Sequence, residues 1–312
     1  MQVRGLVKRY GELTAVDGVD LTVNAGDVYG YLGPNGAGKT TSLRMMLGLI
    51  RPSAGTVRLF GRDPMESVTA LQGVAGFVEA PTFYPYLNAR RNLELLAAYD
   101  GHDAKRKIAA ALDTVELSDR AKDRVGTYSH GMRQRLGIAA ALLRDPKLLL
   151  LDEPATGLDP AGMRDMRLLV RRLADQGMTV LLSSHLLTEV EDVCNRVAIV
   201  RSGRIVYEGE IATLKRGAGT SYRLETTDDT LALRICGAQP GVTDARLNEH
   251  GRITLTADEP AVTVLSQALV EAGALIKALA PETVTLEDLF FSFTEGDGVA
   301  PGPRPPEPAH AT

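Results

Sequence analysis

The sequence predicts an α/β fold in which a largely parallel sheet is covered by helices. Short apolar segments alternate with segments that carry apolar residues at helical spacing, which is typical of strand–helix units. The segment 147–152 has no polar face, and 178–184 is a second buried strand, as expected where helices cover both faces of a parallel sheet. A helix-rich stretch at 88–143 interrupts this alternation, and a smaller α+β unit follows the main domain.

The strands and helices of the main domain can be located by residue number. We expect strands at 2–9, 19–23, 28–32, 56–61, 73–79, 147–152 and 178–184. Helices are expected at 39–49, 163–177 and 187–195, with three or more further helices within 88–143. Residues 196–209 are interpreted as a hairpin that turns at Ser202 and Gly203.

Composition changes mark the boundaries of the expected domains. The main domain is expected at 1–215 and a small α+β domain at 220–295, with strands at 222–226 and 252–256. Its helix opens at Pro260 and places Val262, Leu265 and Leu269 on one face. Proline and glycine dominate 296–312, which cannot bury apolar surface and is expected to be disordered.

The bulk composition excludes several classes of protein. With 44% hydrophobic residues, the 312-residue chain can bury a sizeable core, and its net charge of −4 gives no reason to expect nucleic acid as a partner. Two cysteines, Cys194 and Cys236, exclude a disulfide framework and fit a reducing compartment. No signal peptide and no apolar run of membrane-spanning length is visible. We therefore expect a protein that is soluble, or that reaches a membrane only through a partner.

The segment GPNGAGKT at 33–40 matches the phosphate-loop pattern G-x-x-x-x-G-K-S/T between a strand and a helix. Glycine leaves successive backbone N–H groups free to converge on phosphate oxygens, and the following helix points its positive end at the same anion. An ordinary glycine-rich turn is disfavoured by this context. We expect Lys39 to bridge the terminal phosphates and Thr40 to coordinate Mg²⁺. The predicted nucleotide-binding residues of the loop are Gly33, Pro34, Asn35, Gly36, Ala37, Gly38, Lys39, Thr40 and Thr41.

Two further motifs complete the predicted site. The buried strand that ends in LLLLDE delivers Asp152, which can hold Mg²⁺ directly or through water, and Glu153, which can accept a proton from the attacking water. In YSHGMRQR, Ser129 is expected to cap a helix and Gly131 to leave backbone N–H groups exposed, which makes a second anion-binding helix terminus. A capped helix without any ligand is the alternative for this motif.

The ordered set of these motifs, with LLSSHLLTEVEDVCNRVAIV after them, resembles the nucleotide-binding subunit of ABC transporters over roughly residues 2–215. The resemblance implies a P-loop NTPase fold, ATP as substrate and Mg²⁺ as cofactor. It implies that Tyr10 stacks on adenine, that Asp159 lies along a dimer seam and that His185 touches the γ-phosphate. Catalytic roles then fall to Glu153, His185 and Lys39.

Two positions depart from the family pattern. Glu79 stands where members commonly carry the glutamine that contacts Mg²⁺, and His130 and Met132 replace a glycine and a glutamine of the signature. Glu79 can still reach the metal, whereas the side-chain contact of the signature glutamine is lost at Met132. Both departures, the segment EAPTFYPYL and the C-terminal unit resemble the bacterial drug- and lantibiotic-exporter branch.

The resemblance implies a head-to-tail dimer that holds ATP between Lys39 of one copy and Ser129 and Gly131 of the other. A separate membrane-spanning permease is implied, with the chain at the cytoplasmic face of the membrane. The segment 79–91 is the expected docking surface, because its aromatics (Phe83, Tyr84 and Tyr86) would otherwise be exposed; packing within the helical insertion is the alternative. Two other functions stay open: a soluble ABC-type ATPase without a membrane partner, and a subunit that binds ATP without hydrolysing it.

Overall fold

The structure is a computed structural model that describes residues 1–312 apart from 100–101, 218–219, 248–251, 283–285, 287–289 and 291–312. The chain divides into two compact units, with the boundary between Glu210 and Ile211. Each unit is described by itself. The expected disordered tail at 296–312 lies outside the described residues.

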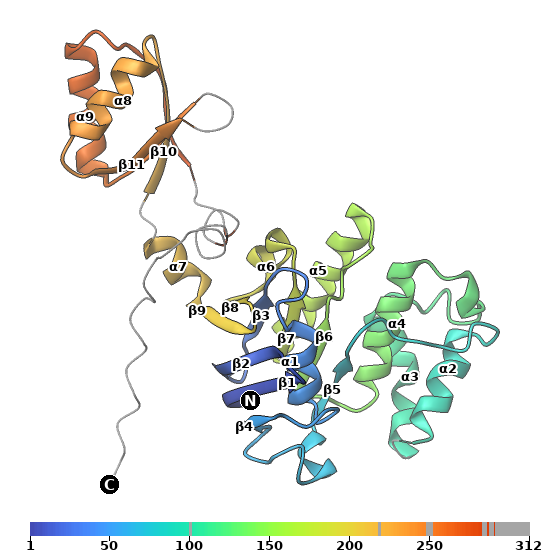
Figure 1. The fold of residues 1–312 in the computed structure, drawn as a ribbon. Helices are drawn as coiled ribbons and strands as arrows, with labels where there is room; N and C mark the ends of the chain where they lie inside the picture. The colour runs from blue at the N-terminus through green and yellow to red at the C-terminus, as the bar shows by residue number, and fades with distance from the viewer. Residues whose placement is uncertain (100–101, 218–219, 248–251, 283–285, 287–289, 291–312) are drawn as a thin grey trace. The chain divides into compact units, whose positions relative to one another are not determined.

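A six-stranded sheet forms the centre of the large unit within the described residues, in the order β5-β6-β7-β3-β8-β9 (Figure 1). All neighbours pair in parallel except β8 and β9, which form the predicted hairpin. Every residue of β3, β6 and β7 is buried, which confirms the sequence prediction for the two strands without a polar face. The strands are β3 Val28–Leu32, β5 Val74–Phe77, β6 Leu148–Asp152, β7 Thr179–Ser184, β8 Arg196–Arg201 and β9 Arg204–Glu210.

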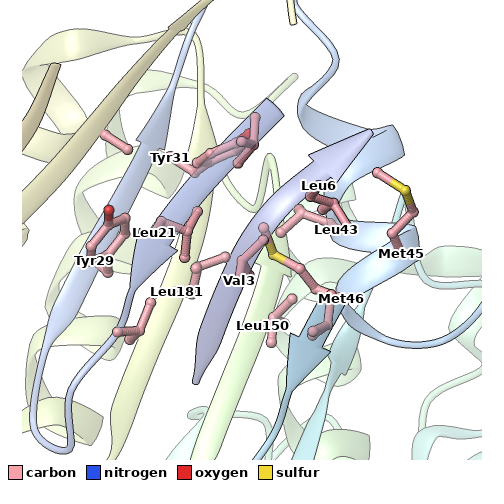
Figure 2. Packing of buried hydrophobic residues seen from close by; sticks show 14 of the residues in the cluster. Val3, Leu6, Leu21, Tyr29, Tyr31, Leu43, Met45, Met46, Leu150 and Leu181 are labelled. Carbon is pink, nitrogen blue, oxygen red and sulfur yellow. The ribbon is translucent and has the colours of Figure 1, made fainter. Parts of the chain in front are cut away.

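A second, antiparallel sheet in the order β2-β1-β4 packs on the phosphate-loop helix α1 and on the first sheet (Figure 2). Its strands are β1 Gln2–Tyr10, β2 Leu13–Thr22 and β4 Ala54–Arg58, and α1 spans Lys39–Met46. Burial raises the pKa of Tyr31 to about 12, and its hydroxyl bonds to Ser42. The shared core includes Val3, Leu6, Leu21, Tyr29, Tyr31, Leu43, Met45, Met46, Leu150 and Leu181.

Helices cover the six-stranded sheet and form the predicted insertion (Figure 1). α5 Pro160–Asp175 and α6 Leu187–Val193 follow β6 and β7 in strand–helix alternation. The insertion contains α2 Ala89–Ala97, α3 His102–Thr114 and α4 His130–Leu142. Two short 3₁₀ turns, Val68–Leu71 and Val125–Thr127, are further helical elements among the described residues of the large unit. These helices confirm the expectation of three or more helices between 88 and 143.

The small unit has the β-α-β-β-α-β order of a ferredoxin-like fold, which confirms an α+β unit after the main domain. Its antiparallel strands lie in the order β11-β12-β10-β13, and α8 and α9 share a core with them. Leu265 and Leu269 are buried in this core and Val262 packs against it, as the sequence predicts. The elements are α7 Ile211–Gly217, β10 Thr220–Thr226, α8 Asp229–Ala238, β11 Val242–Leu247, β12 Ile253–Ala257, α9 Glu259–Glu271 and β13 Ile276–Glu282.

Three expectations about strands and helices need correction. The strand expected at 56–61 ends at Arg58, because Phe60 and Gly61 take positive φ angles and turn the chain. The strand expected at 19–23 belongs to a longer strand that begins at Leu13. In the small unit, α7, α8, β11 and β13 were not expected, since their short mixed sequences carry no clear period.

Candidate nucleotide site

The phosphate loop joins β3 to α1, and its glycines meet two different requirements. A Cβ at Gly38, where φ is 95°, would lie 2.3 Å from the carbonyl oxygen of Ala15, and a Cβ at Gly33 would lie 2.5 Å from that of Val200. A Cβ at Gly36 would meet nothing within 4 Å. Two glycines thus let the loop pack on its surroundings, and the third leaves open space beside the loop that a phosphate chain can fill.

Lys39, the first residue of α1, turns its ammonium back over the loop. Its Nζ donates to the carbonyl oxygens of Gly33 at 2.6 Å and Pro34 at 3.2 Å, and it forms an ion pair with Glu153 Oε1 at 3.1 Å. Only 6% of the side chain is exposed. The predicted phosphate-bridging cation is therefore held in place by the loop and by the predicted general base.

Glu153 follows β6 with a positive φ of 49°, and its carboxylate has three partners. Besides Lys39, Oε2 accepts a bond from the hydroxyl of Thr156 at 2.8 Å and lies 2.6 Å from Nδ1 of His185. Burial by itself would raise the pKa of Glu153, but the bonds from Thr156 and His185 and the charge of Lys39 outweigh it and lower the pKa. The carboxylate is therefore ionised at neutral pH and fixed in orientation.

Asp152, the last residue of β6, is bonded to the strand beside it. Its Oδ1 accepts from the hydroxyl of Ser183 on β7 at 2.5 Å, and its Oδ2 lies 3.4 Å from the backbone N–H of Glu79. The side chain of Glu79 points elsewhere and pairs with Arg44 on α1 at 2.5 Å. In this structure, Asp152 therefore lies beside the site, whereas the carboxylate of Glu79 is engaged with α1.

The signature motif at 128–135 lines a hollow of about 380 Å³ together with the start of α5, and no phosphate-loop residue lines this hollow. Ser129 caps α4 as the sequence predicts, since its hydroxyl accepts from the N–H of Met132 at 3.2 Å. Asp159 caps α5 in the same manner through the N–H of Gly162 at 3.1 Å. Gly131 lines this hollow as well.

The predicted residues thus fall into three groups. Lys39 and His185 each contact Glu153, and Asp152 precedes Glu153. Thr40 and Thr41 continue the first turn of α1. The signature residues and Asp159 line the second hollow, which no phosphate-loop residue lines. Tyr10 lies at the end of β1, half exposed, with the ammonium of Lys8 5.1 Å from its ring centre.

Three contacts were missed by sequence reasoning. Thr156 and Ser183 bond to the two acidic residues, and Arg44 pairs with Glu79. The hydroxyls in LLSSH just before His185 were a usable signal, because neighbouring parallel strands end at one edge of the sheet. The sequence around Arg44 does not indicate its ion pair, because its partner Glu79 is 35 positions away in sequence.

Of the three aromatics in the expected docking segment, Tyr84 and Tyr86 are exposed. Phe83 is half-buried, so the alternative of packing within the chain applies to it in part. Phe83 and Tyr84 line a hollow of about 370 Å³ with Leu95 and Leu96, two partly exposed leucines of α2. An apolar surface on the insertion is therefore open.

Comparison with known proteins supports the same interpretation. Residues 16–156 match the family model described as ABC transporter. The chain is 36% identical over 302 residues to the bacitracin transport ATP-binding protein BcrA of Enterococcus faecalis, covering 96% of this chain and 98% of the relative. It is 37% identical over 308 residues to the daunorubicin/doxorubicin resistance ATP-binding protein DrrA of Streptomyces peucetius, covering 94% and 92%.

Solved structures give the same fold. The dimeric ATP-binding cassette MJ0796, in a post-hydrolysis state bound to ADP and Pi, matches with a TM-score of 0.60 and 25% identity, covering 67% of this chain and 98% of that one. The chain belongs to the ATP-binding proteins of ABC transporters, a family of ATPases, which confirms the expectation from the ordered motifs. Among the described helices, none has both the length and the apolar character that a membrane crossing needs.

Proposed function

We propose that this chain hydrolyses ATP to drive export of a drug, an antibiotic or another substrate through a separate membrane-spanning subunit. The carboxylate of Glu153 carries the proposal, because Lys39, Thr156 and His185 hold it beside Asp152 and the phosphate loop. The names of the relatives BcrA and DrrA, a transport and a resistance protein, support the exporter role.

The proposed chemistry follows from the contacts of Glu153. ATP phosphates occupy the space beside Gly36 and draw the ammonium of Lys39 away from Glu153, which frees Oε1 for the attacking water. Glu153 then accepts a proton from this water as its oxygen attacks the γ-phosphorus, and the bond to the β-phosphate oxygen breaks. His185 keeps Oε2 engaged, so that Oε1 faces the water. Tyr10, exposed at the end of β1, is proposed to stack on the adenine.

Magnesium is the proposed cofactor, held by Thr40 and Asp152, with Glu79 as a further ligand. Hydroxyl and carboxylate oxygens are the ligands that Mg²⁺ prefers, and Asp152 is already oriented by Ser183. The ion would neutralise charge on the phosphates during transfer.

A dimer is proposed because the signature hollow lies apart from the phosphate loop. Ser129, Gly131 and Asp159 line a hollow that lacks any phosphate-loop residue, so each copy carries one half of two ATP sites. The γ-phosphate would join the two halves, and its loss would release them. The dimeric form of the related cassette MJ0796 supports this arrangement.

The proposed permease surface comprises the exposed Tyr84 and Tyr86 and the hollow beside α2. Aromatic and leucine side chains open to solvent favour an apolar partner segment, such as a short helix of the membrane subunit. This would hold the chain at the cytoplasmic face of the membrane. The same surface lies next to the loop of Glu79, which would connect permease contact to the ATP site.

ATP turnover by purified chain tests the enzyme proposal. We expect measurable, Mg²⁺-dependent phosphate release from wild type, none from Lys39→Ala, and ATP binding without release from Glu153→Gln. The Glu153→Gln variant should elute as a dimer with ATP and as a monomer without it. If wild type and Glu153→Gln release phosphate at the same negligible rate, the chain is a non-hydrolysing subunit.

Capture from membranes tests the partner. Tagged chain, expressed with the neighbouring reading frames and solubilised in detergent, should retain one multi-span protein. Tyr84→Ala with Tyr86→Ala should lose it and keep basal ATP turnover, whereas Tyr99→Ala, a change at an exposed tyrosine beyond α2, should retain it. Recovery of ribosomes without a membrane protein would replace the exporter with a soluble ATPase.

A further inference from the structure

A hollow of about 430 Å³ lies at the amino-terminal ends of β5 and β6, whereas Asp152 stands at the carboxyl end of β6. Gly73 and Lys147, which immediately precede these two strands, line the hollow together with Leu59, Phe60 and Arg62 of the turn after β4. Figure 1 shows where β4, β5 and β6 lie in the large unit. The volume is in the range of about 300–1,000 Å³ that small-molecule sites occupy. None of the residues assigned to ATP lines it.

Phe60 projects from a turn that phenylalanine rarely occupies. Leu59 and Arg62 exchange two backbone hydrogen bonds of 2.8 and 2.9 Å, and the two residues between them have φ angles of 50° and 83°. Such a two-residue turn favours asparagine, aspartate or glycine, because a larger side chain is strained at positive φ. Phe60 is 53% exposed as a residue, so core burial does not offset the strain. Strained residues of this kind mark functional positions more often than others.

The ring of Phe60 and the stem of Lys147 flank Gly73. A Cβ on Gly73 would lie 3.5 Å from Cε2 of Phe60 and 3.8 Å from Cγ of Lys147. The backbone N–H of Lys147 donates to the carbonyl oxygen of Gly73 at 2.7 Å, which fixes the base of the lysine side chain. The aromatic ring of Phe60 and the stem of Lys147 thus both lie close to Gly73 at this hollow.

Two basic side chains, Arg62 and Lys147, and one acidic side chain, Asp145, line this hollow. Neither Arg62 nor Lys147 forms an ion pair with another residue in the described part of the chain. The acidic side chain on the rim, Asp145, forms an ion pair with Lys107 at 3.1 Å. The amide of Gln72 supplies a further polar group.

We propose that this hollow binds a small organic anion that carries a flat ring. The ring would stack on Phe60, and the carboxylate or phosphate would lie between Arg62 and Lys147, where charge-assisted hydrogen bonds form. An aromatic carboxylate and a nucleoside monophosphate share this chemistry. The site is independent of ATP hydrolysis, so it stands or falls separately from the proposed function.

Ligand-detected NMR on the full chain tests the site with two probes, 2-naphthoate and AMP. The Lys39→Ala background keeps AMP out of the phosphate loop. The paired substitution of Arg62→Gln with Lys147→Gln should weaken binding at least about tenfold, as should Phe60→Asn. Lys122→Gln, at an exposed lysine in the helical insertion, and Tyr99→Ala should leave the affinity unchanged. Whichever probe binds tighter identifies the anion class.

Three results would overturn the proposal. One is that neither probe binds, or that the probes bind with the same affinity whether or not the Arg62→Gln and Lys147→Gln pair is added to the Lys39→Ala background. Another is binding of naphthoate to wild type that Lys39→Ala abolishes, which would place the probe in the phosphate loop. The third is a lower melting temperature for Phe60→Asn without ligand. Asparagine suits this turn, so the melting temperature should hold or rise unless the ring is needed for packing.

Discussion

The guanidinium of Arg44 lies 2.5 Å from the carboxylate of Glu79, which joins the helix after the phosphate loop to the loop after β5. Glu79 replaces an uncharged glutamine of the family pattern, and Arg44 neutralises the extra charge in this structure. For the carboxylate to reach Mg²⁺, this ion pair has to open. The side chain of Glu79 is 66% exposed and that of Arg44 is 37% exposed, so the ion pair itself stabilises the fold by at most about 1 kcal/mol.

Glu79→Gln and Arg44→Gln should therefore shift the Mg²⁺ requirement of ATP turnover in opposite directions. Removing the carboxylate should raise the half-saturating Mg²⁺ concentration several-fold, whereas removing its cation should lower it. Phosphate release across a Mg²⁺ titration at fixed ATP measures both. Shifts in the same direction would mean that Glu79 does not act on the metal.

Thr156→Val should slow catalysis without weakening ATP binding. The hydroxyl of Thr156 donates to Oε2 of Glu153 at 2.8 Å, and loss of a hydrogen bond to a charged group costs about 1.5–3 kcal/mol. We expect kcat to fall at least about tenfold while the KM for ATP stays within about twofold. Thr156→Ser keeps the hydroxyl and is the matched control. Equal kcat values for the two variants would remove Thr156 from the positioning of Glu153.

Gly137→Ala should destabilise the protein, although alanine favours helices by about 1 kcal/mol over glycine. A Cβ at Gly137, inside α4, would lie 2.6 Å from Cγ of Pro81 in the loop after Glu79. A proline ring cannot turn away, and such overpacking costs about 1–3 kcal/mol. Chemical denaturation should report a net loss of stability. Gly237→Ala in α8, where a Cβ meets nothing within 4 Å, is the control and should stabilise.

Acid should remove the stability that Glu153 contributes. Its pKa is lowered in the folded protein, so this contribution is fully present above the unfolded value of about 4.3 and is lost as pH falls through the folded value. The difference in unfolding free energy between wild type and Glu153→Gln should therefore change in favour of the variant below about pH 4.3.

Glu189 supplies a control of opposite sign. Burial raises its pKa, despite a bond from Ser184, so its charge disfavours folding at neutral pH. Wild type should therefore gain stability relative to Glu189→Gln as pH falls through that raised value. Denaturant titrations between pH 3 and pH 7 give the unfolding free energy of each variant relative to wild type. If this difference changes with pH in the same direction for Glu153→Gln and Glu189→Gln, the two pKa assignments cannot both be right.

Much of the large unit could be predicted because its signals are local. Buried strands such as 147–152 have no polar face, and the glycines of 33–38 and the lysine after them form a contiguous motif. The small unit was harder, because α8 and β11 are short and partly exposed. The helix α8 is stabilised by the core that it shares with β10, β12 and α9, and β11 by its pairing with β12, so neither is fixed by its own short sequence.

The sequence by itself determined the phosphate loop, the order of the motifs and the alternation of strands and helices, since each depends on residues adjacent in the chain. The tertiary structure alone decided which side chains meet. The chain brings Thr156, His185 and Lys39 around one carboxylate, turns Glu79 toward Arg44, and leaves Phe60 exposed on a strained turn. These contacts join residues on separate strands and loops, and only the packing of the whole unit fixes their distances.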